Sequence, residues 1–195
     1  RQMCIRDSDM VEAVCALDMR ERGVLAGDTV VSTVMCNFGF VRAMKEMGIN
    51  VVQTKVGDRY VLEAMREHGY SIGGEQSGHM ILLDHNSTGD GLMTACQFLA
   101  AVIRSGKPVA EAIQVMEKMP QTLINVRVND KHAVEDSAEV AAAVASAEEA
   151  LGEDGRVLLR PSGTEPVVRV MVEAVDPAAA QAHAEAIAAV VEACV

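Results

Sequence analysis

The chain has 195 residues, half of them hydrophobic, which is enough for one large domain or two small ones with a substantial core. Its formal net charge of −11 argues against nucleic acid or an anionic membrane as a partner, because both would repel most of the surface. Five scattered cysteines without a C-x-x-C pair indicate neither disulfides nor zinc, and without a transmembrane run or a signal-peptide pattern we expect a reducing cytoplasm.

The first part of the chain alternates predicted strands with predicted helices. Residues 1–8 have no usable periodicity, whereas an apolar face that starts after Asp9 predicts a helix ending at Gly23. The next elements are predicted strands at 29–35, 50–54 and 71–73, separated by helices at 38–47 and 58–68. Short connections between such elements are typical of parallel βαβ units with right-handed crossovers.

The elements that follow complete this first domain. We expect a strand at 80–83, then a helix that Asp90 caps, and then a second helix from Pro108 to about Met119. The helix after Asp90 carries a row of apolar residues, which are Leu92, Cys96, Leu99 and Ile103.

Two polar loops follow neighbouring strands of this predicted sheet. Loop 55–59 comes after the second strand and loop 75–79 after the third. Ligands of open α/β sheets bind outside the carboxyl ends of the strands. Both loops should therefore emerge at the same edge of the sheet.

Loop 55–59 contains Lys55, Gly57, Asp58 and Arg59. Lys55 could neutralise a phosphate or the reacting oxygen of a sugar. The alternative is that Asp58 caps the following helix and that Lys55 and Arg59 are solvated. We expect Asp58 to be a cap in either case.

In loop 75–79, Glu75, Ser77 and His79 alternate, so that in an extended loop their side chains would project to the same side. A carboxylate, a hydroxyl and an imidazole placed in this way suit the neighbouring hydroxyls of a sugar ring. The alternative is a glycine-rich bend whose polar residues only satisfy the backbone. A second polar group consists of Asp84, His85 and Asp90, and no metal site is predicted there. Turn and cap roles explain the two aspartates, and the spacing suits no standard metal motif.

Pro120 marks the expected domain boundary. The segments beyond it are a strand at 122–128, an alanine-rich helix at 133–151, strands at 157–159 and 167–174, and a helix at 177–194. The order βαββα predicts a small antiparallel sheet with two helices on one face. The fold class is thus an α/β domain with a parallel or mixed sheet at 9–119, followed by a small α+β domain at 120–195.

A compact polar turn separates the two strands of the second domain. It offers two guanidiniums, two hydroxyls and a glycine that lets the backbone come close to a ligand, in Arg160, Ser162, Gly163, Thr164 and Arg169. Forked guanidiniums, hydroxyls and backbone N–H groups around a small concavity are what a phosphate dianion needs. The alternative is an ordinary polar turn with solvated arginines.

Three motifs resemble those of the α-D-phosphohexomutase family. R-P-S-G-T-E-P at 160–166 resembles its phosphate-binding loop, G-G-E-Q-S-G-H at 73–79 its sugar-binding loop, and K-V-G-D-R-Y at 55–60 a loop typical of the phosphoglucosamine mutase branch. The similarity runs from about Met10 to the C-terminus, and residues 1–8 match nothing in the family. It implies that 9–119 is a truncated third domain and 120–195 the fourth domain.

The resemblance also implies roles for single residues. The residues that match Glu75 and Ser77 hold sugar hydroxyls, and the histidine that matches His79 lies close to the reacting oxygens, where it would assist proton transfer. The match favours a supporting role in catalysis for Lys55. The phosphate loop would grip whichever phosphate is not reacting.

The implied reaction interconverts glucosamine 6-phosphate and glucosamine 1-phosphate, on the route to bacterial cell-wall precursors. In the family a phosphoserine donates the phosphoryl group and Mg²⁺, held by a D-x-D-x-D-R loop, offsets charge. This chain contains neither loop, and Asp7 and Asp9 do not complete one. We therefore expect a C-terminal portion that needs the missing N-terminal domains and is inactive alone.

Two alternatives stay open on the sequence. One is a fragment of another phosphohexomutase that acts on mannose or glucose phosphates, and the other is a noncatalytic module that binds a phosphosugar. A homodimer is also left open.

Overall fold

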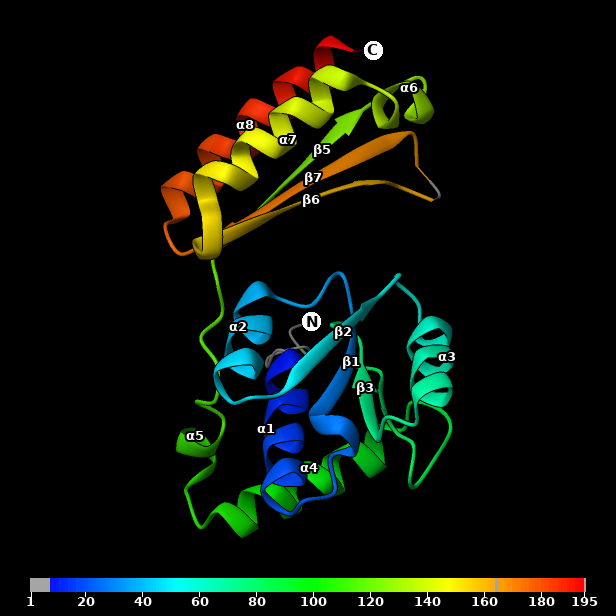
Figure 1. Cartoon of the computed structure of the whole chain (residues 1–195), viewed down its shortest axis with the longest axis vertical. Coiled ribbons are helices and arrows are strands. Elements are labelled where there is room, and N and C mark those ends of the chain that lie inside the picture. Colours follow the sequence, from blue (N-terminus) through cyan, green and yellow to red (C-terminus); the bar gives the residue numbers. More distant parts are fainter. Residues whose placement is uncertain (1–7, 164, 195) are drawn as a thin grey trace. The chain divides into compact units, whose positions relative to one another are not determined.

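The computed structural model describes residues 8–163 and 165–194, with the side chains of residues 131 and 132 excepted. The chain divides after Lys118 into two compact units (Figure 1).

The first unit is built on a mixed sheet of four strands in the order β2-β1-β3-β4. Its elements are α1 (Ser8–Glu21), a 3-10 turn η1 (Ala26–Asp28), β1 (Thr29–Thr33), α2 (Phe38–Glu46), β2 (Asn50–Thr54), α3 (Asp58–His68), β3 (Ile72–Gly74), β4 (Met80–Leu82), α4 (Gly91–Ser105) and α5 (Val109–Ala112). Strand β1 is parallel to β2 and β3, and β3 is antiparallel to β4. The predicted α/β class with a mixed sheet is confirmed.

Helices cover both faces of this sheet. On one face, side chains of α1, α2 and α4 pack with Val30 and Ile72. On the other face, Val61 and Met65 of α3 pack with Val31 and Ile81. Because helices cover both faces, every residue of β1 is buried, and its sequence does not alternate between apolar and polar residues.

Local signals fix several helix ends. The Asn37 side chain accepts a hydrogen bond from the N–H of Gly39 and begins α2, and the Asp90 carboxylate accepts from Leu92 and Met93 and begins α4. Helix α3 ends at Gly69, which adopts a left-handed conformation with φ of +74°.

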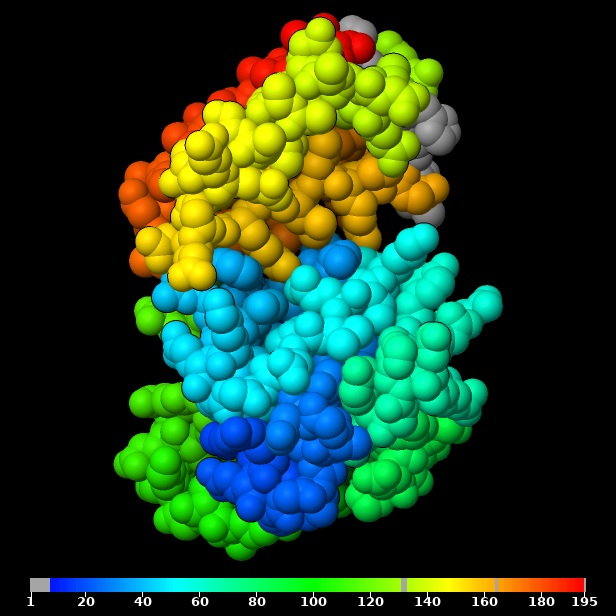
Figure 2. Space-filling view, viewed as in Figure 1, coloured from blue at the N-terminus to red at the C-terminus, as the bar shows by residue number. Residues whose placement is uncertain are grey.

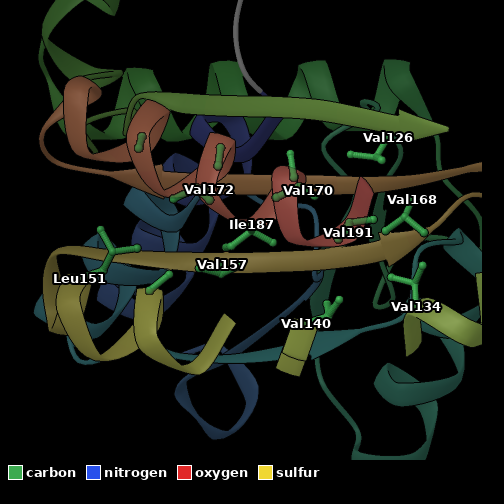
Figure 3. Close-up of a cluster of buried hydrophobic side chains, with 14 of the residues drawn as sticks. Val126, Val134, Val140, Leu151, Val157, Val168, Val170, Val172, Ile187 and Val191 are labelled. Carbon is green, nitrogen blue, oxygen red and sulfur yellow. The ribbon is translucent and has the colours of Figure 1, made fainter. Parts of the chain in front are cut away.

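The second unit is a three-stranded antiparallel sheet in the order β5-β7-β6. Its elements are β5 (Gln121–Arg127), α6 (Lys131–Glu135), α7 (Ala138–Leu151), a 3-10 turn η2 (Gly152–Asp154), β6 (Gly155–Pro161), β7 (Val167–Ala174) and α8 (Pro177–Ala193). Helices α7 and α8 cover one face of the sheet, as predicted (Figure 1). Valines of the central strand β7 pack there against Ile187 and Val191 of α8 (Figure 3).

Two predicted helices are wrong in extent. The helix expected at 133–151 is interrupted, because the Ser137 hydroxyl accepts a hydrogen bond from the N–H of Val140 and starts α7 as a new helix. The helix expected from Pro108 to Met119 ends after α5. The chain then packs so close to α2 that a Cβ on Gly39 would lie 1.9 Å from the carbonyl oxygen of Glu117. Tertiary packing therefore overrides helix propensity at this point.

Candidate functional site

The two polar loops of the first unit meet, as predicted. The N–H of Gly57, in the loop after β2, donates a 2.9 Å hydrogen bond to Oε1 of Glu75, in the loop after β3. Both strands run parallel to β1 and therefore end at the same edge of the sheet. The Glu75 side chain is only 12 % exposed, so one face of its carboxylate is fixed inside this edge.

The segment from Glu75 to His79 is a tight turn, as in the glycine-rich bend considered as the alternative to an extended loop. The N–H of Glu75 donates to the carbonyl of His79 at 2.9 Å, and the N–H of Gly78 donates to the carbonyl of Glu75 at 3.0 Å. Gly78 has a φ of +101°, which an L side chain rarely adopts. The turn is closed in this way because β3 and β4 are antiparallel neighbours.

The turn still gathers the three predicted side chains. The Ser77 hydroxyl lies 3.3 Å from Nδ1 of His79, and Oε2 of Glu75 lies 3.9 Å from the same nitrogen. The His79 side chain is 62 % exposed, so its ring is accessible from solvent. A carboxylate, a hydroxyl and an imidazole within reach of one another can bind adjacent hydroxyls and pass a proton between them.

The first turn of α1 contacts this site, and the sequence analysis did not predict these contacts. The Ser8 hydroxyl donates to the carbonyl oxygen of Gln76 at 3.0 Å, across 68 positions of sequence. At the next residue, Oδ2 of Asp9 accepts a 2.7 Å hydrogen bond from the N–H of Asn37. These two contacts attach α1 to the turn at residues 75–79 and to the start of α2.

Glu12 is a buried acid at the same end of the sheet. Its side chain is 2 % exposed, and its Oε2 lies 3.5 Å from the Ser32 hydroxyl, which itself lies 3.3 Å from the carbonyl oxygen of Gly74. Burial raises the pKa of Glu12 well above its usual range, the charge of Asp9 raises it further, and the Ser32 contact opposes both. Only the spacing of acidic residues on an otherwise apolar helix face could have indicated these contacts.

Loop 55–59 leads into α3, and the residue predicted to cap this helix, Asp58, is not the cap. The N-cap of α3 is Gly57, with φ of +135°, and Asp58 lies in the first turn of the helix instead of capping it. There its negative charge still favours the helix N-terminus. Arg59 forms a 2.7 Å ion pair with Glu63 on the same helix, and Lys55 is exposed at the end of β2.

In the second unit, the polar turn joins β6 to β7, and Arg160 stands directly opposite Arg169 in the strand register. Side chains that face each other across antiparallel strands lie on the same side of the sheet, and two like charges in that arrangement repel. Glu165 supplies one counter-charge, because its Oε2 lies 3.0 Å from Nη2 of Arg169. An anion bound between the arginines would relieve the remaining repulsion.

The backbone of this turn is held from inside. The N–H of buried Ser162 donates to the carbonyl of Val167 at 2.9 Å, and its hydroxyl accepts from the N–H of Glu165 at 3.2 Å. A Cβ placed on Gly163 would meet nothing within 4 Å, so the fold leaves open space there. Thr164, the other predicted phosphate ligand, lies outside the described residues.

Among the side chains that the structure describes, no group of three or more histidines, cysteines or acids is placed to hold a metal ion. Asp90 acts as the cap of α4. None of the helices that the structure describes is long and apolar enough to cross a bilayer.

Two family models match the chain. The model of the phosphoglucomutase/phosphomannomutase α/β/α domain III matches residues 7–119, and that of the phosphoglucomutase/phosphomannomutase C-terminal domain matches residues 123–190.

Curated relatives are similar over almost the whole chain. A phosphoglucosamine mutase of Frankia alni is 58 % identical over 97 % of this chain, and one of Streptomyces coelicolor is 60 % identical over 87 %. The matches span 42 % and 38 % of those relatives. The chain therefore covers about two fifths of the length of the relatives it resembles.

Solved structures share the fold. The N-acetylphosphoglucosamine mutase of Aspergillus fumigatus, solved with GlcNAc-6P and magnesium, gives a TM-score of 0.78 at 19 % identity over 95 % of this chain and 46 % of its own. A phosphoglucomutase/phosphomannomutase family protein of Burkholderia thailandensis gives 0.77 at 25 % identity, over 96 % of this chain and 42 % of its own. Motifs, fold and family models agree, and the chain belongs to the phosphoglucomutase/phosphomannomutase family of α-D-phosphohexomutases.

Proposed function

We propose that the chain is the sugar- and phosphate-recognition portion of an intramolecular phosphotransferase that interconverts glucosamine 6-phosphate and glucosamine 1-phosphate. The observation that carries this proposal is the Glu75 carboxylate, fixed by Gly57 and placed beside Ser77 and His79. Identities of 58 % and 60 % to phosphoglucosamine mutases support the amino sugar over mannose or glucose phosphates.

The first unit would recognise the sugar. Glu75 and Ser77 would accept and donate hydrogen bonds to neighbouring hydroxyls, and the exposed His79 ring would take or return a proton at a reacting oxygen. Lys55 would offset negative charge from the end of β2. Gly57, Asp58 and Arg59 complete the loop, and a ligand in this role would draw Arg59 away from Glu63, its partner in the free chain.

The second unit would hold the phosphate that is not reacting. Arg160 and Arg169 would supply charge-assisted hydrogen bonds, and the open space at Gly163 would let the backbone approach a phosphate oxygen. Ser162 and Thr164 would add hydroxyl contacts, as their match to the family's phosphate loop implies. A bound phosphate would compete with Glu165 for Arg169.

Phosphoryl transfer itself would need groups from elsewhere in a longer enzyme. The family's phosphoserine and its magnesium loop have no counterpart in this sequence, and the described residues contain no cluster fit to hold magnesium. When bound, magnesium offsets charge on the transferring phosphoryl group. We assign no step through it to this chain.

Calorimetric titration of the folded chain with glucosamine 6-phosphate tests the proposal, with glucose 6-phosphate as the competing sugar and Arg169→Ala as the matched variant. We expect binding that prefers the amino sugar and weakens in the variant. Equal binding of both sugars, or equal binding by the variant, would contradict the proposed roles.

A further inference from the structure

Helix α4 has apolar side chains all round. Its inner side includes Met93, Phe98, Ala101 and Val102, which pack against the sheet and α1 or are buried. Its outer side carries Leu92, Cys96, Leu99 and Ile103, the apolar row that the sequence marks. A helix that is hydrophobic on every side is normally buried on every side.

The outer row, called here the α4 stripe (Leu92, Cys96, Leu99 and Ile103), is nevertheless exposed. Leu92 and Ile103 are each 77 % exposed and Leu99 is 53 % exposed. Spacings of four, three and four residues place them on a single face, as in the seam of a helix pair. The only charged residue of α4 is Arg104, which is bound to Asp18 at 2.6 Å. Figure 2 shows the green segment that contains α4 and α5 at the surface of the first unit.

A second copy of the chain is a poor occupant for the α4 stripe. The helix has 15 residues and is therefore about 22 Å long. A stable interface between separate proteins takes roughly 20–30 residues from each partner, and the stripe offers far fewer. A partner on the same polypeptide needs less contact, because tethering raises its effective concentration.

We infer that the α4 stripe is the docking surface for the part of the chain that precedes domain III in full-length phosphohexomutases. This rests on the proposed function, in which the working enzyme is longer than these residues. More than half of each curated relative lies outside its match, since the matches span 42 % and 38 % of them. That part would join the first unit at α1, which packs against α4 through the Asp18–Arg104 pair.

Cys96 provides the readout, because it lies in the stripe as a free and exposed thiol. A chimera would join the N-terminal part of the Frankia alni relative, up to the residue that aligns with Ser8, to Asp9 of this chain. Alkylation by iodoacetamide would be followed at Cys96 by mass spectrometry, with buried Cys15 and partly exposed Cys194 as internal references. We expect Cys96 to react about tenfold more slowly in the chimera than in the isolated chain, since labelling then requires the interface to open.

Matched variants test the stripe itself. The double variant Leu99→Glu and Ile103→Glu should restore fast labelling of Cys96 in the chimera, and Val175→Glu, at an exposed valine of the second unit, should not. In the isolated chain the double variant should leave the unfolding midpoint unchanged. A lowered midpoint would show that the stripe is already packed within the unit and would overturn the inference.

The remaining outcomes separate this inference from the proposed function. Equal labelling in chimera and isolated chain would overturn the inference, even if the chimera has mutase activity. Protection of Cys96 in the isolated chain that grows with concentration, together with a dimer in sedimentation, would assign the stripe to a second copy and also overturn it. Protection in a chimera without mutase activity would leave the docking surface standing and remove the proposed function.

Discussion

The backbone N–H of Gly57 donates a 2.9 Å hydrogen bond to Oε1 of Glu75, and this bond ties the loop after β2 to the turn after β3. The two oxygens of Glu75 therefore act differently. Oε1 organises the loops, while Oε2, 3.9 Å from Nδ1 of His79, remains close to the exposed ring. A ligand hydroxyl would thus meet a carboxylate whose position is set before binding.

Replacing Glu75 with alanine should lower the free energy of unfolding by about 1 kcal/mol, because the Gly57 N–H loses its acceptor. Glu75→Gln keeps an acceptor oxygen and should cost less. Urea unfolding measures both changes, and Glu67→Ala, at an exposed position of α3, serves as the control. An unchanged free energy in Glu75→Ala would mean that the hydrogen bond does not hold the loops together in solution.

Arg169→Ala should weaken the binding of a phosphosugar by about 1.5–3 kcal/mol, the range for a lost charge-assisted hydrogen bond. Arg169 stands opposite Arg160, so the variant also removes the local excess of positive charge. The control is Arg66→Ala, which removes the same charge at an exposed position. Calorimetry of both variants therefore separates the loss of the phosphate contact from the change in net charge. An affinity equal to that of the control would remove Arg169 from the phosphate site.

Asp90→Ala should lower the free energy of unfolding by about 1 kcal/mol. The Asp90 carboxylate accepts hydrogen bonds from two backbone N–H groups of α4, and both would lose their acceptor. Asp84→Ala, which removes an exposed acid from the same loop, is the matched control. Thermal unfolding that is equally affected in both variants would argue against the cap.

The pure 195-residue chain should show no mutase turnover, since the family's phosphoserine and magnesium loops are absent from its sequence. A coupled assay for glucosamine 1-phosphate checks this, with the full-length Streptomyces coelicolor relative as the positive control. Turnover by the chain that survives further purification would show that its own residues supply a nucleophile.

Local signals in the sequence were enough to predict the sheet and the edge that the two polar loops share. Asn37 and Gly69 act on their own helices, and the strand–helix alternation alone predicts that loops 55–59 and 75–79 share an edge. The capping of α3 was mispredicted because Gly57, at a φ of +135°, takes the cap position that aspartate usually fills.

The support beneath the site could not be predicted in the same way. Ser8 contacts Gln76 across 68 positions, and Asp9 contacts Asn37 across 28, so no local pattern reports either contact. The α4 stripe shows a different limit of prediction from sequence. Its periodicity marks an apolar helix face correctly, yet periodicity does not say what covers that face, and in the described structure the face is exposed.

Glu12 should make the chain less stable as the pH rises. Its pKa in the folded chain is raised by burial and by Asp9, whereas in the unfolded chain it is near the ordinary value of about 4.3. The folded state thus binds the proton more tightly, so this contribution to stability is complete below the unfolded pKa and is lost as the pH rises toward the folded pKa.

Glu12→Gln carries no charge and should raise the free energy of unfolding more at pH 8 than at pH 5. Urea unfolding at both pH values measures the difference, with exposed Glu21→Gln at the end of the same helix as the control. If Glu12→Gln shifted stability equally at pH 5 and pH 8, the buried carboxyl would not be taking up a proton on folding.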